Sequence, residues 1–391
     1  MKGCDFMLHS AAGRLYFLDN LRAAIILLVI IFHIALGYIA PPLPWWYVVD
    51  TQTSQAFIPF TLTVDVFIMP VMFWIAGYFT LPVLQRKGIG SFFRNKFYRI
   101  VLPWLAGAIL VAPAMTYMIW FSRSATPPPY LYFWQNIFFL LQVFNHAHYW
   151  FLGLLFYFYL LVGCLQTWRP GWLKKASSPA APTVSFFALF TLLCSLAFFV
   201  PTLLVPADTW FGGLYIVCFQ PARLGICLFY FLLGLHAWRN SWFTSASAYA
   251  PKLRNWLLLV IPATLAFTLY RLSMPQELTV LLKAGHALLH SLFCLCMFMT
   301  LLCLFQRYIN YSGSFWRNLA ASSYAIYILH QLIVLPIAYI VQKWQFPILP
   351  KYLLVCAVCL ILCYAAGYTA TRLLGNLPKS SSLEDRKQNT K

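Results

Sequence analysis

Long apolar runs separated by short polar loops make up almost the whole chain. A membrane-spanning helix needs about 20 mostly apolar residues. Ten runs reach that length, at roughly 21–40, 57–82, 98–121, 148–167, 184–205, 213–238, 254–272, 279–304, 320–341 and 351–374. The polar stretch that follows has the composition of a disordered segment. The sequence therefore predicts an all-α, polytopic integral membrane protein, with one transmembrane domain over residues 1–375 and a disordered cytoplasmic tail over 376–391.

Charge supports this class and predicts an orientation. The 391 residues are 62% hydrophobic and only 9% charged, and the net charge is +19. The cations lie in short loops and not in basic blocks with interleaved aromatics, so we expect no nucleic-acid partner. Cytoplasmic loops of membrane proteins are enriched in Lys and Arg. One set of alternate loops holds only Arg123, Arg271, Lys343 and Lys351, while the other set and the two termini hold most of the rest. Both termini are therefore predicted to be cytoplasmic.

The first run carries the clearest chemical signal. Arg22 is followed by ten apolar residues and then by His33. Eleven residues are close to three helical turns, so both side chains face the same way, about 16 Å apart along the axis. This spacing predicts Arg22 at a membrane surface and His33 near the bilayer middle. A titratable group inside the membrane is a functional-site hypothesis by default.

Other polar residues also fall inside the predicted spans. They are Asp65, Arg223, Lys283, His286, His290 and His330. Counted from the predicted span ends, His33, Arg223, His290 and His330 all fall near mid-membrane, which predicts one shared cavity. Because the cations outnumber the nearby acids, an anionic ligand or lipid is a natural partner. A purely structural alternative stays open, in which Arg223 pairs with Asp65, Lys283 reaches the interface, and the histidines bond to neighbouring hydroxyls and carbonyls.

A second basic group enters the third run. Lys96 and Arg99 are three residues apart and thus on one helix face, with further cations close by. Such a group suits a polyphosphate such as coenzyme A, and simple anchoring at the cytoplasmic surface is the competing interpretation. We expect no metal site, because His146 and His148 have no cysteine or carboxylate near them in the sequence.

Six segments resemble, in order along the chain, the motifs of the type-three membrane acyltransferases. In that family the first helix carries Arg or Lys, ten residues and then His, as residues 22–33 do. The other segments are FWIAGYF (73–79), KFYRIVLP (96–103), HYWFLGLLFYFYLL (148–161), FYFLLG (229–234) and SSYAIYILH (322–330). The second and fourth segments look closest to the branch that modifies periplasmic glucans. Lys96 departs from the family's usual Arg, and Ala76 from the usual Ser before Gly77.

The resemblance implies acyl transfer from cytoplasmic acyl-CoA to a hydroxyl of an extracytoplasmic or envelope carbohydrate, with acetyl or succinyl as the group moved. Acyl-CoA is then a co-substrate, and no cofactor is expected to be bound permanently. By resemblance, His33 is the general base, and Arg22, Lys96 and Arg99 bind the donor. The cavity or acceptor side is expected to comprise His148, Trp150, Arg223, His290, Tyr327 and His330. The expected location is the bacterial cytoplasmic membrane, and the oligomeric state is left open.

Two other functions fit the same composition. A polytopic transporter or flippase for an anionic solute or a lipid-linked glycan also uses charges at the membrane midplane. Such a protein is expected to show an inverted repeat, and none is visible in the sequence. A non-catalytic partner in a glycan-export assembly is the second alternative, and it would not need His33 to be titratable.

Overall fold

Helices account for nearly all of the regular structure. The computed structural model describes residues 14–139, 145–176, 180–213, 216–243, 249, 251–275 and 277–376. The longer helices are α1 (Tyr16–Leu36), α2 (Ile58–Lys87), α3 (Ile89–Lys96), α5 (Ala112–Arg123), α7 (Trp150–Trp168), α8 (Val184–Thr202), α9 (Pro221–Arg239), α10 (Leu253–Leu272), α11 (Val280–Tyr308), α12 (Ser314–Val341) and α13 (Ile348–Asn376). The short pieces are η1 (Gln55–Phe57), η2 (Phe97–Val101), α4 (Leu102–Ala106), η3 (Gly107–Val111), α6 (Tyr130–Tyr132), η4 (Phe133–Phe138), η5 (Ala147–Tyr149), η6 (Pro170–Leu173), and the antiparallel strands β1 (Phe211–Gly213) and β2 (Val217–Phe219).

The all-α prediction is confirmed, and so is the number of spans. Within the described ranges, ten helical segments are long and apolar enough to cross a membrane. The third of them, Ile89–Arg123, is continuous from α3 to α5 through two π-helical stretches. Two boundaries near the polar groups were wrong. The first helix ends at Leu36 and not at residue 40, and the sixth run, expected to start at residue 213, is preceded by the strands β1 and β2, so that α9 begins at Pro221. The predicted tail, beyond Asn376, lies outside the described residues.

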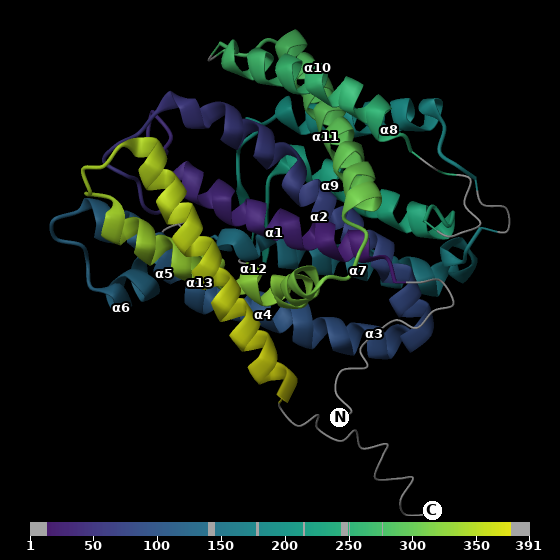
Figure 1. Ribbon diagram of the computed structural model, residues 1–391, viewed down its shortest axis with the longest axis horizontal. Helices are drawn as coiled ribbons and strands as arrows, with labels where there is room; N and C mark the ends of the chain where they lie inside the picture. Colours follow the sequence, from purple (N-terminus) through teal and green to yellow (C-terminus); the bar gives the residue numbers. More distant parts are fainter. Residues whose placement is uncertain are drawn as a thin grey trace, which may run out of the picture.

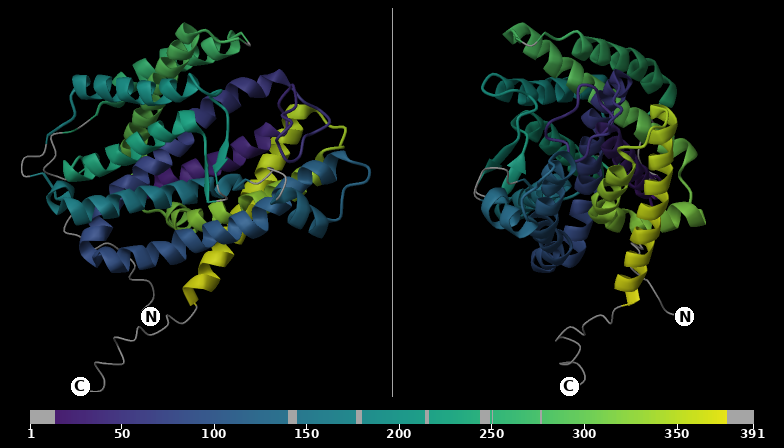
Figure 2. Two further views of the ribbon diagram at one scale, coloured as in Figure 1. Left: turned by 180° about the vertical axis from the view of Figure 1, so that it is seen from behind. Right: turned by 90° about the vertical axis from the view of Figure 1, so that its left-hand side faces the viewer.

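Two helices that carry the sequence motifs lie in the interior. α1 and α2 run through the middle of the molecule, with α8, α10 and α11 to one side and α3 to α5 to the other (Figures 1 and 2). α1 contacts α2, α11, α12 and α13. α10 lies at the periphery and presents mostly exposed apolar residues. This placement puts the Arg22–His33 helix among the helices that form both groups of polar side chains described below.

The closest helix pair is formed by α2 and α9, and glycines make it possible. A Cβ atom on Gly77 would clash with the carbonyl oxygen of Phe231, and one on Gly234 would clash with that of Trp74. Small residues at such positions let two backbones approach within a membrane, where packing drives helix association. The motif segments 73–79 and 229–234 therefore meet each other, and their glycines have a packing role.

We expect Gly77→Leu to destabilise the protein, because the added side chain has no space between α2 and α9. Overpacking typically costs about 1–3 kcal/mol, so the thermal unfolding midpoint in detergent should fall clearly. Gly90→Leu is the matched control, since a Cβ atom there meets nothing within 4 Å. Equal midpoints for the two variants would contradict the packing role.

Candidate active site

A hydrogen bond between two histidines joins α1 to α12. Nδ1 of His33 lies 3.0 Å from Nε2 of His330, and the two rings are nearly parallel, at 13°. Nδ1 of His330 lies 2.7 Å from the carbonyl oxygen of Tyr327. A carbonyl only accepts, so this Nδ1 must carry the proton. In the neutral pair, Nε2 of His330 then accepts from Nδ1–H of His33, which leaves the lone pair of His33 on its own Nε2.

His330 is held rigidly and His33 is more open. The His330 side chain is completely buried, whereas His33 is half-buried at the edge of a small pocket. His148 packs against His330 with ring centroids 4.6 Å apart, and its backbone carbonyl accepts the hydroxyl proton of Tyr327. Tyr149 donates to the carbonyl of Ile328 at 2.8 Å. The start of α7 therefore fixes the turn of α12 that presents His330 to His33.

The end of the first helix differs from the expectation. α1 ends at Leu36, with Gly37 as its C-cap, instead of continuing to residue 40. His33 thus lies three residues before the helix end, while His330 lies near the middle of α12. The chain after Gly37 folds back over His33, so burial comes from this loop as well as from helices.

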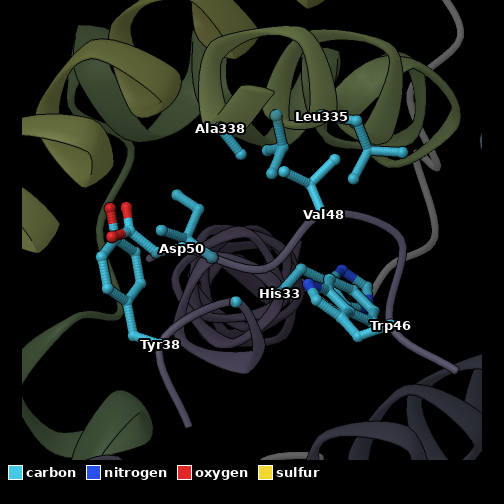
Figure 3. Close-up of a pocket in the computed structure, with 10 residues that line it drawn as sticks. His33, Tyr38, Trp46, Val48, Asp50, Leu335 and Ala338 are labelled. Carbon is cyan, nitrogen blue, oxygen red and sulfur yellow. The ribbon is translucent and has the colours of Figure 1, made fainter. Parts of the chain in front are cut away.

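The loop between α1 and α2 closes the pocket over His33. Trp46 stacks on the His33 ring with centroids 5.6 Å apart, and the two rings overlap in the end-on view of α1 (Figure 3). Arg123, at the end of α5, donates to the carbonyls of Pro44 (2.7 Å) and Trp46. The cavity is about 10 Å³, enough for one water molecule. With the loop in this position, the cavity holds nothing larger than a water molecule.

A buried ion pair ties the same loop to α13. Nζ of Lys351 lies 2.7 Å from a carboxylate oxygen of Asp50, and the two side chains are only 1% and 4% exposed. The ammonium also donates to the carbonyls of Gln342 and Trp344. Asp50 lines the His33 pocket, on the opposite side from Trp46 (Figure 3). The Asp50 carboxylate is therefore already paired with a cation inside this pocket.

The cations predicted to bind the donor gather at the other end of the site. Arg22 donates to the carbonyl of Ala320 at 3.3 Å, and Tyr324, one turn later on α12, donates to the carbonyl of Arg99. Arg22 and the backbone of Arg99 therefore both contact α12, at residues four apart. The guanidinium of Arg22 also pairs with Asp19 at 3.4 Å, and its Nε atom is buried without a hydrogen-bond partner in the described structure. We call this region the basic end.

Lys96 belongs to the basic end but is less free than expected. Its ammonium lies 4.2 Å from the ring centroid of Tyr159 and 5.0 Å from that of Phe92. It interacts electrostatically with Lys87 and Arg99, which places three cations together. Arg99 is exposed and lies in the π-helical stretch Phe97–Val101. Such bulges are frequent at functional sites because they re-aim side chains.

The prediction of one shared cavity is wrong. Trp150 and Arg223 line a separate pocket on the other side of α7, and His290 contacts Phe198 and Phe267 instead of the His33 pair. The reason is geometric: His148 and Trp150 are two residues apart at the start of a helix and so point to different faces. Arg223 pairs with Asp65 at 2.5 Å, as the structural alternative proposed.

The hydropathy pattern does not identify several residues of these sites. Trp46, Asp50 and Arg123 lie in or next to a predicted loop, where the apolar pattern assigns no partner. Lys351 counts only as a loop cation in the sequence pattern, whereas the structure places it in a buried ion pair. A signal existed for Asp50, because an isolated carboxylate beside a predicted span needs a cation, but nothing in the spacing singles out Lys351. Among the described residues, no group of three or more His, Cys, Asp or Glu side chains is placed to hold a metal ion.

Comparison with known proteins shows the family of the chain. The family model described as "Acyltransferase domain", that of acyltransferase family 3, matches residues 15–368. The chain belongs to this family. It is thus a multi-pass membrane acyltransferase, and the interpretation as a transporter is set aside. The resemblance noted from the six motifs is confirmed.

Curated relatives match only part of the chain. "Glucans biosynthesis protein C" of Shigella dysenteriae serotype 1 is 31% identical over 115 residues, which is 29% of each chain. The protein of the same name from Escherichia coli K12 is 30% identical over 113 residues, again 29% of each. The aligned part is thus less than a third of these relatives' length. No solved structure matches significantly.

We expect Arg123→Ala to loosen the loop over His33, because it removes the donors that hold the carbonyls of Pro44 and Trp46. Diethyl pyrocarbonate modifies neutral imidazole nitrogens, so the modification rate at His33, read by peptide mass spectrometry, should rise. Arg254→Ala, at an exposed position on α10, is the control. An unchanged rate at His33 would show that Arg123 does not hold the pocket closed.

Proposed function

We propose that this acyltransferase moves an acyl group, acetyl or succinyl, from cytoplasmic acyl-CoA to a hydroxyl of an extracytoplasmic or envelope carbohydrate. The observation that carries the proposal is the hydrogen-bonded histidine pair. It leaves a basic Nε2 on His33, on the same helix as Arg22. The name of the partial relatives, which refers to glucan biosynthesis, supports a carbohydrate acceptor. The location proposed is the bacterial cytoplasmic membrane.

The donor would enter from the basic end. Arg22, Lys96 and Arg99 supply charge-assisted donors for the phosphates of CoA, and the bidentate geometry of arginine suits this role. The axial distance from Arg22 to His33 is about 16 Å, comparable to the reach of the pantetheine arm. The thioester would then lie beside the His33 ring. Because both chain termini are proposed to be cytoplasmic, the basic end faces the cytoplasm.

The reaction proposed needs one base and returns its proton. Nε2 of His33 accepts the proton of the attacking sugar hydroxyl while the hydroxyl oxygen bonds to the thioester carbon. The C–S bond then breaks, and the imidazolium gives the proton to the departing thiolate of CoA. His330 is a positioning residue: by accepting from Nδ1–H of His33, it keeps the lone pair on the nitrogen that faces the pocket. No metal ion is needed in this scheme.

Replacing the base tests the proposal directly. We expect His33→Gln to lower the transfer of labelled acyl groups from acyl-CoA to glucan by about 10²–10⁴-fold, the usual contribution of general base catalysis. The assay uses the purified full-length protein in nanodiscs. The midpoint of thermal unfolding should stay close to the parent value. Retained transfer by a folded His33→Gln protein would remove His33 from the mechanism.

His330 variants separate positioning from packing in the same assay. His330→Leu should lower kcat about 10–100-fold, by analogy with the loss when the partner that orients a metal-bound histidine is removed, with little change in the KM for acyl-CoA. His330→Gln should recover part of the rate, because its amide oxygen can accept from Nδ1–H of His33. Equal loss in both variants would indicate a packing role instead.

Removing a cation at the basic end tests the donor site. Arg99→Ala should raise the KM for acyl-CoA with a smaller effect on kcat, because the phosphate contact is made in the ground state as well as the transition state. Arg307→Ala, another exposed arginine, is the control. If acyl-CoA affinity stays unaltered in Arg99→Ala, the donor site must lie elsewhere.

A further inference from the structure

A second group of charged side chains lies at the end of the bundle opposite the basic end. Arg223 begins α9, Arg271 ends α10, and Asp208 lies between α8 and β1. The carboxylate of Asp208 stands between the two guanidinium groups, 3.4 Å from Arg223 and 3.6 Å from Arg271. Asp65 forms a closer pair with Arg223, at 2.5 Å. This group plays no part in the chemistry at His33.

Asp208 is held loosely compared with the other acid. Charge-assisted N–H···O bonds are usually about 2.7–2.9 Å long, so both of its contacts are long. Its side chain is 61% exposed, whereas that of Asp65 is 35% exposed. It sits on a loop in which the described residues form, as regular structure, a hairpin of two three-residue strands. The contacts of Asp208 are therefore the kind that an external anion can replace.

The charge balance shows what Asp208 compensates. With Asp65 and Asp208 present, the two arginines are neutralised one for one. Without the Asp208 carboxylate, one positive charge is left over, and the Nε atom of Arg223 is buried with no hydrogen-bond partner in the described structure. A partly buried guanidinium in this state favours an anion. Asp208 thus occupies the position of a carboxylate or phosphate ligand.

The walls beside Arg223 suit one face of a sugar, and the cavity between them, about 10 Å³, must widen by displacement of Asp208 before a sugar residue enters. Trp150 and Trp210 lie at 70° with ring centroids 5.5 Å apart, and both line the pocket together with Phe219, Gln220 and Arg223. Trp210 is 46% exposed, so a ring face is accessible. Aromatic faces with a few convergent polar groups are typical of small-ligand sites, and the C–H faces of sugars pack on such rings.

The position relative to His33 links this site to the reaction. Trp150 lines the second pocket, and His148, two residues earlier, packs against His330. The two sites therefore lie on opposite sides of the start of α7, about one helix diameter apart, or about 10 Å. A carbohydrate chain can span that distance.

We propose that Arg223 and Arg271, with Trp150 and Trp210, bind a carboxylate- or phosphate-bearing residue of the carbohydrate acceptor, which displaces Asp208. The proposal rests on the proposed function for the identity of the acceptor, and it adds that the acceptor is anionic. Asp208 acts as an internal competitor that occupies the site when no acceptor is bound. Arg271, which has no closer acid, contributes mainly to anion affinity.

The test measures binding without acyl donor, so that catalysis is not involved. The full-length protein is placed in nanodiscs of phosphatidylcholine and titrated calorimetrically with an oligogalacturonide or a neutral galactan oligosaccharide of equal length. We expect the uronide to bind and the galactan to bind more weakly. Asp208→Asn should tighten uronide binding about two- to five-fold, and Arg271→Gln should weaken it by a similar factor, the range for exposed charge pairs.

Two controls make the result specific. Glu277→Gln makes the same charge change on an exposed residue of the loop after α10, and it should leave uronide affinity unchanged. His33→Gln should bind the uronide like the parent protein. Weaker or unchanged binding in Asp208→Asn, or equal binding of galactan, would overturn the proposal. A third outcome would also overturn the proposal. If added phosphatidylglycerol abolishes uronide binding, the site belongs to a lipid headgroup.

The same preparation separates this proposal from the proposed function. Acyl transfer to a neutral glucan, measured beside the titration, reports on the His33 chemistry alone. Transfer without uronide binding would reject the anionic site and leave the acyltransfer mechanism standing. Uronide binding without any transfer would support the anionic site and reject the acyltransfer mechanism.

Discussion

The hydrogen bond between His33 and His330 is the constraint on which the active-site geometry depends. It joins the first helix of the chain to α12, and the carbonyl of Tyr327 determines which nitrogen of each ring carries a proton. Because His330 is fully buried and backed by His148, the pair has one arrangement in its neutral form. A basic nitrogen is thereby presented to a pocket inside a membrane domain, where an unpaired charge would be costly.

α12 connects this pair to the basic end. On α12, the carbonyl of Ala320 accepts a hydrogen bond from Arg22, and the hydroxyl of Tyr324 donates one to the carbonyl of Arg99. Further along the same helix, His330 meets His33. The opposite side of the pocket is closed by the loop that carries Trp46, which Arg123 and the Asp50–Lys351 ion pair hold in place. In the proposed mechanism the donor reaches His33 from the basic end and the acceptor from the side of this loop. The start of α7 lies between the His33 pair and the second group of charges at Arg223.

Much of the fold could be predicted from the sequence, because apolar runs of about 20 residues leave few alternatives to membrane helices. The Arg22–His33 spacing likewise places both residues on one face of a single helix. The residues that position His33 were harder to find. Trp46, Asp50 and Arg123 act through a loop between spans, and hydropathy carries no information about which loop covers which helix end. Arg223 and His290 were misplaced because depth in the membrane does not specify which face of the bundle a side chain occupies.

The most direct test of the account is the protonation pattern of the His33 ring. Solid-state NMR of ¹⁵N-histidine-labelled protein in lipid, with His33 assigned by comparison with His33→Gln, distinguishes the two tautomers. The account predicts that neutral His33 carries its proton on Nδ1 and has an unprotonated Nε2, and that His330→Leu disturbs this pattern. A proton on Nε2 of His33 in the parent protein, with Nδ1 unprotonated, would contradict it.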